Sequence, residues 1–178
     1  YSRDYFRFIA GDRESLARDS IWIPEGPPLG DEDLIGVLRA APFAVVPSGT
    51  LDESDDRRFI ARMSLPSRIP FILATSHTPV LVVGDRRTAA ARFVLEAGVG
   101  LVCPYERGAF QAAVERILRP EVNLAMRQKA LDLAPVFSDE GAAEWIWQSL
   151  QRGAPADDRF EKLMAGMQPR SATIEERR

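Results

Sequence analysis

A polar turn with one cation stands directly before an apolar helix in this sequence. Ser64, Ser67 and Arg68 surround Pro66 in "MSLPSRIPFILATS", and the apolar residues begin immediately after them. The first N–H groups of a helix have no acceptor within the helix, and the helix dipole makes this end partly positive. Hydroxyls, an arginine and free N–H groups together are typical of a phosphate site. The alternative is an ordinary helix start with a solvated arginine.

Two further turns offer groups that could contact a phosphate. Ser48 and Gly49 follow the apolar run "FAVVP", and Thr88 follows "GDRR". Thr88 is also a typical helix N-cap, which would leave Arg86 and Arg87 in solvent. Ser48 and Gly49 are equally compatible with a simple turn after a strand. Both alternatives stay open from the residues alone.

The sequence lacks the common patterns of metal and nucleophilic sites. It has one histidine, His77, and one cysteine, Cys103, far apart, so neither a zinc site nor a Ser-His-Asp triad can be assembled. We expect Cys103 in the core and His77 exposed in a turn. The acidic run "LDESDD" lacks the spacing of a Ca²⁺ loop and predicts a solvated segment. We therefore expect no metal and no cofactor.

The composition is that of an ordinary globular protein. The chain has 178 residues, of which 46% are hydrophobic and 28% charged, and this length can bury a sizeable core. The formal net charge of -3, with Lys and Arg scattered, disfavours nucleic acid as a partner. No apolar run has the length of a membrane span. A single cysteine suits a reducing compartment, so we expect a cytoplasmic protein.

Strand-like and helix-like patterns alternate along the chain. Strands are expected at residues 5–10, 21–24, 43–49, 79–84 and 99–105, and helices at 31–41, 67–75, 85–98, 106–119, 121–134 and 138–152. This alternation predicts an α/β fold, a Rossmann-like doubly wound parallel sheet with helices on both faces and further C-terminal helices. Ligands in such sheets bind beyond the carboxyl ends of the strands, where the candidate turns fall.

The last part of the chain is expected to be helical. Ser138 is a candidate N-cap for the helix "SDEGAAEWIWQSLQR". Its residues Trp145, Ile146 and Trp147 are expected to pack in the core or against another domain. We expect residues 154–178 to form a short C-terminal helix and a frayed tail.

The order of these pieces resembles the C-terminal, donor-binding half of GT-B-fold retaining glycosyltransferases of the group 1 type, which use nucleotide-diphosphate sugars. The matching pieces are "IWIPEG", "DEDLIGVLRAA", "FAVVPSG", "LPSRIPFILATSHTPVL" and "AMRQKALDLAPVFSDEGAAEWIWQSL". The resemblance covers roughly residues 5 to 150. It implies that residues 1–153 form a nucleotide-sugar-binding domain, the C-terminal half of a two-domain protein. The N-terminal acceptor domain would then lie outside this chain, and the full protein could associate peripherally with a membrane.

The resemblance also implies a role for each candidate residue. The donor phosphates and sugar would lie against Ser67, Arg68, Ser64, Ser48, Gly49 and Thr88. The nucleobase would be flanked by Pro24, Glu25 and Gly26. No catalytic base or nucleophile is visible in this chain.

The sequence departs from the family pattern at two glutamates. The second of them holds the donor ribose from the first turns of the helix; Phe71 or Ile72 stands there, and Met63 or Ser64 at the first position. This keeps a second reading open, a glycosyltransferase-like domain without turnover that acts as a binding or assembly module. A third is a doubly wound domain for another nucleotide or phosphate ligand.

Overall fold

The computed structural model describes residues 29–54 and 58–158. The chain divides into two compact units, Tyr1–Gly30 and Asp31–Arg178, and every described helix and strand lies in the second. The strands expected at residues 5–10 and 21–24 lie outside the described residues, as do Pro24, Glu25 and Gly26. The boundary expected after residue 153 stays a prediction.

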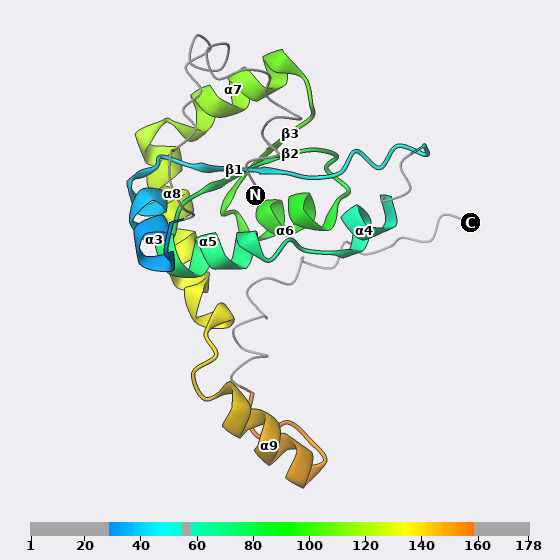
Figure 1. The fold of residues 1–178 in the computed structure, drawn as a ribbon, viewed down its shortest axis with the longest axis vertical. Helices are drawn as coiled ribbons and strands as arrows, with labels where there is room; N and C mark the ends of the chain where they lie inside the picture. The colour runs from blue at the N-terminus through cyan, green and yellow to red at the C-terminus, as the bar shows by residue number, and fades with distance from the viewer. Residues whose placement is uncertain (1–28, 55–57, 159–178) are drawn as a thin grey trace, which may run out of the picture. The chain divides into compact units, whose positions relative to one another are not determined.

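Helices and strands alternate through the described residues (Figure 1). They are α3 (Asp31–Ala40), β1 (Ala44–Pro47), α4 (Arg58–Met63), α5 (Arg68–Ser76), β2 (Val80–Val83), α6 (Ala89–Ala97), β3 (Gly100–Cys103), α7 (Arg107–Ile117), α8 (Pro120–Leu133), the 3-10 helix η1 (Ala134–Phe137) and α9 (Ala142–Arg152). The strands and helices predicted between residues 31 and 152 are thus present, with α4 added between β1 and α5. Most of the short helix and tail predicted at residues 154–178 lies outside the described residues. The α/β class is confirmed.

The described strands form one parallel sheet in the order β1-β2-β3. Ala44 of β1 pairs with Val80 of β2, and Val80 pairs with Gly100 of β3. Every residue of β2 is buried, which explains why this strand reads as an unbroken apolar run. Parallel strands bring their carboxyl ends to one edge, so the turns after Pro47, Val83 and Cys103 lie at the same edge.

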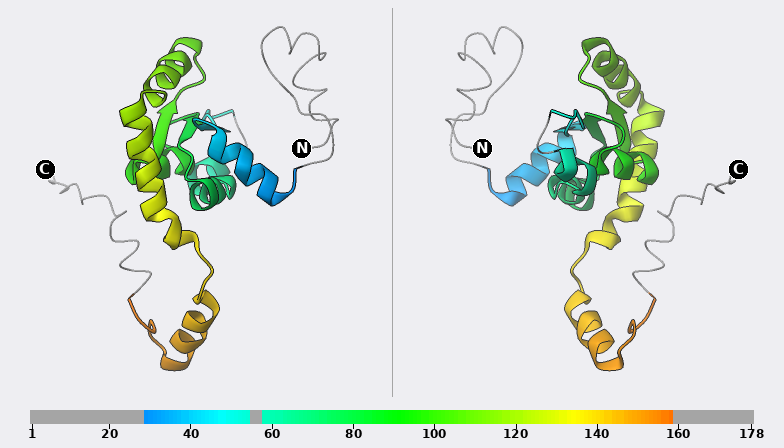
Figure 2. Two further views of the ribbon diagram at one scale, coloured as in Figure 1. Left: turned by 90° about the vertical axis from the view of Figure 1, so that its left-hand side faces the viewer. Right: turned by 90° about the vertical axis from the view of Figure 1, so that its right-hand side faces the viewer.

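The side chains of β2 contribute to two hydrophobic clusters. Val80 and Val82 pack with residues of α5 and α6, whereas Leu81 and Val83 pack with residues of α7. Successive side chains of a strand point to opposite faces, so the alternation follows from the strand itself. Helix α8 contacts both α5 and α7 (Figure 2).

Local capping signals decide where α6 begins and ends. Thr88 has extended backbone, and its side chain accepts a hydrogen bond from the N–H of Ala91 at 3.3 Å. Gly98 ends the helix in a left-handed conformation at φ 65. A glycine adopts this conformation without the strain that a Cβ would cause. The N-cap predicted at Thr88 is confirmed, and so is the end of the helix predicted at residue 98.

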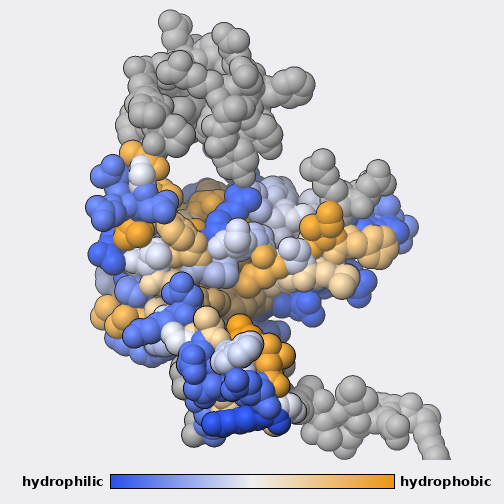
Figure 3. Space-filling model, turned by 60° about the horizontal axis from the view of Figure 1, so that its bottom comes forward, coloured by the Kyte–Doolittle hydropathy of each residue, from blue (hydrophilic) through white to orange (hydrophobic). Residues whose placement is uncertain are grey.

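The predicted N-cap of α9 is wrong. Gly141, at φ 70, precedes the helix, and the hydroxyl of Ser138 accepts a hydrogen bond from the N–H of Glu140 instead. The left-handed conformation at Gly141 redirects the backbone, and the helix starts only after it. Of the two alternatives for Ile146 and Trp147, packing in the core is wrong, because they are 53% and 59% exposed, and packing against another domain stays a prediction. Figure 3 shows hydrophobic and hydrophilic side chains next to one another on this helix, at the bottom of the view.

The one cysteine of the chain is buried and the one histidine is half-buried. Cys103 is buried in the sheet, and this burial raises the pKa of its thiol, so the expected core position is confirmed. His77 is half-buried rather than exposed, because it ends α5 in a left-handed conformation at φ 54.

Candidate functional site

Backbone hydrogen bonds join the exits of β1 and β2. The N–H of Ser48 donates to the carbonyl oxygen of Val83 at 2.8 Å, and the N–H of Asp85 donates to that of Gly49 at 3.2 Å. A Cβ at Gly84, whose φ is 156, would lie 3.0 Å from both the Cβ of Ser48 and the oxygen of Gly49. The glycine therefore allows the two exits to approach closely, and this brings Ser48 and Gly49 beside the turn that contains Thr88.

Tyr105, which follows β3, links the exit of this strand to the exit of β1. Its hydroxyl donates a hydrogen bond to the carbonyl oxygen of Ser48 at 2.7 Å, and the N–H of Gly84 donates to that of Cys103 at 2.8 Å. Partial burial raises the pKa of the Tyr105 phenol, so it is a hydrogen-bond donor at neutral pH. The sequence marks "PYERG" as a loop at the ligand edge, but it contains no signal that pairs this tyrosine with Ser48.

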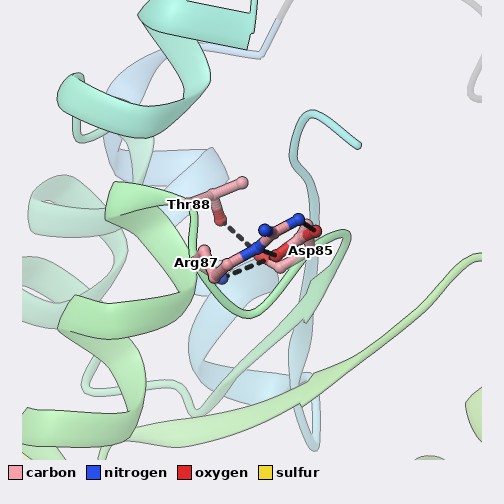
Figure 4. A network of polar contacts seen from close by, with 3 residues as sticks. All are labelled: Asp85, Arg87 and Thr88. Carbon is pink, nitrogen blue, oxygen red and sulfur yellow. Dashed lines mark hydrogen bonds and ion pairs between the residues drawn. The ribbon is translucent and has the colours of Figure 1, made fainter. Parts of the chain in front are cut away.

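Asp85 and Arg87 form an ion pair in the turn after β2 (Figure 4). The guanidinium donates from Nε to Oδ1 at 3.0 Å and from Nη2 to Oδ2 at 2.8 Å, and the N–H of Arg87 donates to Oδ1 at 2.8 Å. These bonds from the side chain and backbone of Arg87 lower the pKa of Asp85 to about 2. Arg87 is thus held by Asp85, while its side chain stays 74% exposed, as expected.

We expect Asp85→Asn to lower the free energy of unfolding by about 1 kcal/mol at pH 7, because it removes this exposed ion pair. The folded-state pKa of Asp85 is below its ordinary value of 3.8. Its stabilising effect is therefore present above about pH 4 and is lost as the pH falls toward about 2. Urea denaturation across this range measures the effect.

Asp139→Asn is the matched control, since the Asp139 carboxylate makes no hydrogen bond in the part of the chain that the structure describes. Its stability should follow that of the unmodified protein at every pH. A gap between Asp85→Asn and the unmodified protein that persists undiminished at pH 2 would contradict the assigned ion pair.

The hydroxyl of Thr88 is engaged in hydrogen bonds at the start of α6. It donates to the carbonyl oxygen of Asp85 at 2.9 Å and accepts from the N–H of Ala91, and the residue is fully buried. A phosphate could reach this hydroxyl only by displacing the cap. We therefore assign Thr88 to the start of α6, and the phosphate contact implied by the resemblance has no geometric support.

The turn before α5 presents an exposed polar surface. Ser64, Ser67 and Arg68 are exposed, and their side chains make no hydrogen bond to any residue that the structure describes. The N–H of Ile69 donates to Pro66, and Pro70 has no N–H, so only the N–H groups of Ser67 and Arg68 remain for an anion. This is a smaller set of donors than a typical helix start offers. No hydrogen bond in the described structure joins this turn to Ser48 or Thr88.

The residues at the two glutamate positions of the resemblance are apolar or exposed. Ile72 is 6% exposed and lies in the core, and Phe71 is half-buried against the same cluster. Met63 and Ser64 are exposed at the end of α4. None of these side chains can accept hydrogen bonds from a ribose as a carboxylate would.

A pocket beside α4 contains residues that the sequence patterns did not single out. Its volume is about 290 Å³, and its lining residues are Leu51, Glu53, Arg58, Phe59, Arg62 and Arg87. Arg58 and Arg62 are four residues apart, so they share one face of α4, and this spacing was the only signal for the pocket in the sequence. Arg87 is distant from them in the sequence, and only the fold places it in the same pocket.

No protein-family model matches this chain, and no curated protein or solved structure is significantly similar to it. In residues 29–54 and 58–158, no helix is long and apolar enough to cross a membrane. The same residues contain no group of three or more His, Cys, Asp or Glu side chains that could hold a metal ion. The geometry of the turns and the pocket is therefore the basis for assigning a function.

Proposed function

We propose that this chain is the donor-binding half of a GT-B-type glycosyltransferase, which binds a nucleotide-diphosphate sugar for transfer to an acceptor. The observation that supports this proposal is the meeting of the three strand exits at one edge of a parallel sheet, where ligands bind in α/β folds. The two hydrophobic clusters of β2 support the doubly wound form of the sheet. On this proposal the protein works in the cytoplasm, and its N-terminal acceptor domain lies outside this chain.

The donor diphosphate would lie against the start of α5. Arg68 would take one phosphate in a two-pronged contact, and the free N–H groups of Ser67 and Arg68 would add to it. Ser64, Ser48 and Gly49 would line the sugar and diphosphate, and residues 24–26 would flank the base. These groups would stabilise the charge that develops on the leaving diphosphate, which is an electrostatic role and not a covalent one.

One observation favours a second candidate function. Because Phe71 and Ile72 pack in the core, the start of α5 offers no carboxylate for the donor ribose. A domain that has lost this contact could retain the fold and serve as a binding or assembly module. Nucleotide binding separates the two candidates.

Calorimetric titration of the full protein with UDP, GDP and ADP tests the donor site. We expect one nucleotide to bind, and Arg68→Ala to weaken it by about 1.5–3 kcal/mol, the cost of a lost hydrogen bond to a charged group. Arg116→Ala, an exposed arginine on α7, is the control and should leave binding unchanged. If none of the nucleotides binds at millimolar concentration, the donor site is absent and the module becomes the better explanation.

A further inference from the structure

We infer that the pocket beside α4 is a second anion site, separate from the start of α5, and that it binds a small phosphomonoester that carries hydroxyl groups, such as a sugar phosphate. The inference does not depend on the proposed donor function. The pocket volume of about 290 Å³ is at the small end of the range for ligand pockets. It suits a ligand of sugar-phosphate size better than a whole nucleotide sugar.

The cations of this pocket come from separate parts of the chain. Arg58 and Arg62 lie one helical turn apart on α4, and Arg87 lies in the turn after β2. Helix α4 is held against the sheet edge, because a Cβ at Gly49 would lie only 2.5 Å from the Cβ of Ala61. Helices α4 and α6 are in contact, and Arg58, Arg62 and Arg87 all line the one pocket.

Two of the three guanidinium groups are already positioned by the protein. Asp85 holds Arg87 through two side-chain hydrogen bonds, and Arg58 donates from Nη1 to the carbonyl oxygen of Glu53 at 2.8 Å. The guanidinium carbon of Arg58 lies 5.1 Å from the ring centre of Phe59. Both arginines keep further N–H donors for a ligand. Positioned donors lose less conformational freedom on binding, which favours affinity.

Arg62 contributes the third cation of the pocket. Its backbone carbonyl accepts a hydrogen bond from Nη2 of Arg92 at 3.3 Å, but its guanidinium has no acceptor among residues 29–54 and 58–158. A phosphate that enters the pocket would supply that acceptor. Arg62 is exposed on α4, so we expect its substitution to leave the fold undisturbed.

The charges and the walls define the class of ligand. Three arginines and Glu53 line the pocket, and Asp85 is paired with Arg87, so these five side chains carry one excess positive charge. Arginine forks match the geometry of a phosphate. Glu53 would repel a second anionic group but can accept hydrogen bonds from hydroxyls, while Leu51 and Phe59 offer apolar contact. A phosphomonoester that carries hydroxyl groups fits the excess positive charge, the Glu53 carboxylate and the apolar contacts of Leu51 and Phe59.

Calorimetric titration of the full protein with glucose 6-phosphate, inorganic phosphate and glucose, at one fixed salt concentration, tests this site. We expect saturable binding of glucose 6-phosphate, weaker binding of phosphate and none of glucose. Arg62→Gln should weaken the binding of glucose 6-phosphate about tenfold or more, as a lost charge-assisted hydrogen bond predicts. The matched control Arg116→Gln, on α7, should change nothing.

Arg68→Ala separates this site from the start of α5. We expect it to leave the binding of glucose 6-phosphate unchanged, whatever it does to nucleotides. Loss of binding in Arg68→Ala but not in Arg62→Gln would overturn the inference, because the anion would then lie at α5. Equal binding to Arg62→Gln and the unmodified protein, absence of saturable binding, or binding only to vesicles of anionic lipid would overturn it as well.

Discussion

Gly100→Ala is expected to lower the free energy of unfolding by about 3 kcal/mol, the upper range for overpacking a close-packed interior. A Cβ at this position would collide with the carbonyl oxygen of Val80 and would lie 2.9 Å from Cγ1 of Val94. Val80 is the register partner of Gly100 on the central strand, so its backbone cannot move without disturbing the pairing of β2 with β3. Chemical denaturation followed by circular dichroism measures the change.

Gly36→Ala provides the matched control for this substitution. Gly36 lies within α3, and no atom comes within 4 Å of a Cβ placed on it. Alanine in a helix should raise the free energy of unfolding by about 0.5–1 kcal/mol, because the unfolded chain loses conformational freedom. If Gly100→Ala were as stable as Gly36→Ala, the close approach of β3 to Val80 would be wrong.

Leu73→Ala is expected to cost about 3 kcal/mol or more of unfolding free energy, since a buried Leu→Ala change loses both transfer energy and packing. Leu73 is 0% exposed and packs in the cluster that joins α5 to the sheet. The surrounding β2 and α6 side chains are themselves buried and cannot collapse fully into the space left behind. Thermal or urea denaturation of the purified variant measures the loss.

Leu124→Ala makes the same chemical change on an exposed helix. Leu124 is 69% exposed on α8, and Leu and Ala have similar helix propensities, so stability should change by less than about 0.5 kcal/mol. Similar losses in the two variants would contradict the burial of α5. A specific loss in Leu73→Ala would show that α5, which positions Ser67 and Arg68, is anchored by the core.

The candidate ligand groups fall in two places that differ in construction. At the start of α5, Ser67 and Arg68 are exposed and their side chains are unrestrained by any described residue. In the pocket, Arg87 and Arg58 are held by protein acceptors. Restrained donors bind anions at a lower entropic cost than mobile ones. The pocket is therefore the better organised anion site, while the α5 turn is the one that the family resemblance implies.

Features that depend on near neighbours in the chain could be predicted from the sequence. The run "PVLVVG" predicts a buried strand, because four consecutive apolar residues suit a strand covered on both sides, and β2 is fully buried. Thr88 and Gly98 predict the ends of α6, because a cap involves hydrogen bonds to backbone within the same turn. The Ser138 prediction was wrong because a left-handed glycine nearby, Gly141, competed for the start of α9.

Only the tertiary structure decided which of these local pieces meet. The hydrogen bond from Tyr105 to the oxygen of Ser48 and the meeting of Arg87 with Arg58 and Arg62 join residues that are far apart in the sequence. Hydrophobic periodicity specifies the buried face of each element, but it carries no information about which polar side chains of different loops converge. The sequence by itself therefore determined the α/β pattern, both ends of α6 and the polar turn before α5. The packing of α4 against the edge of the parallel sheet decided that a pocket of arginines exists, because that packing brings their charges to one place.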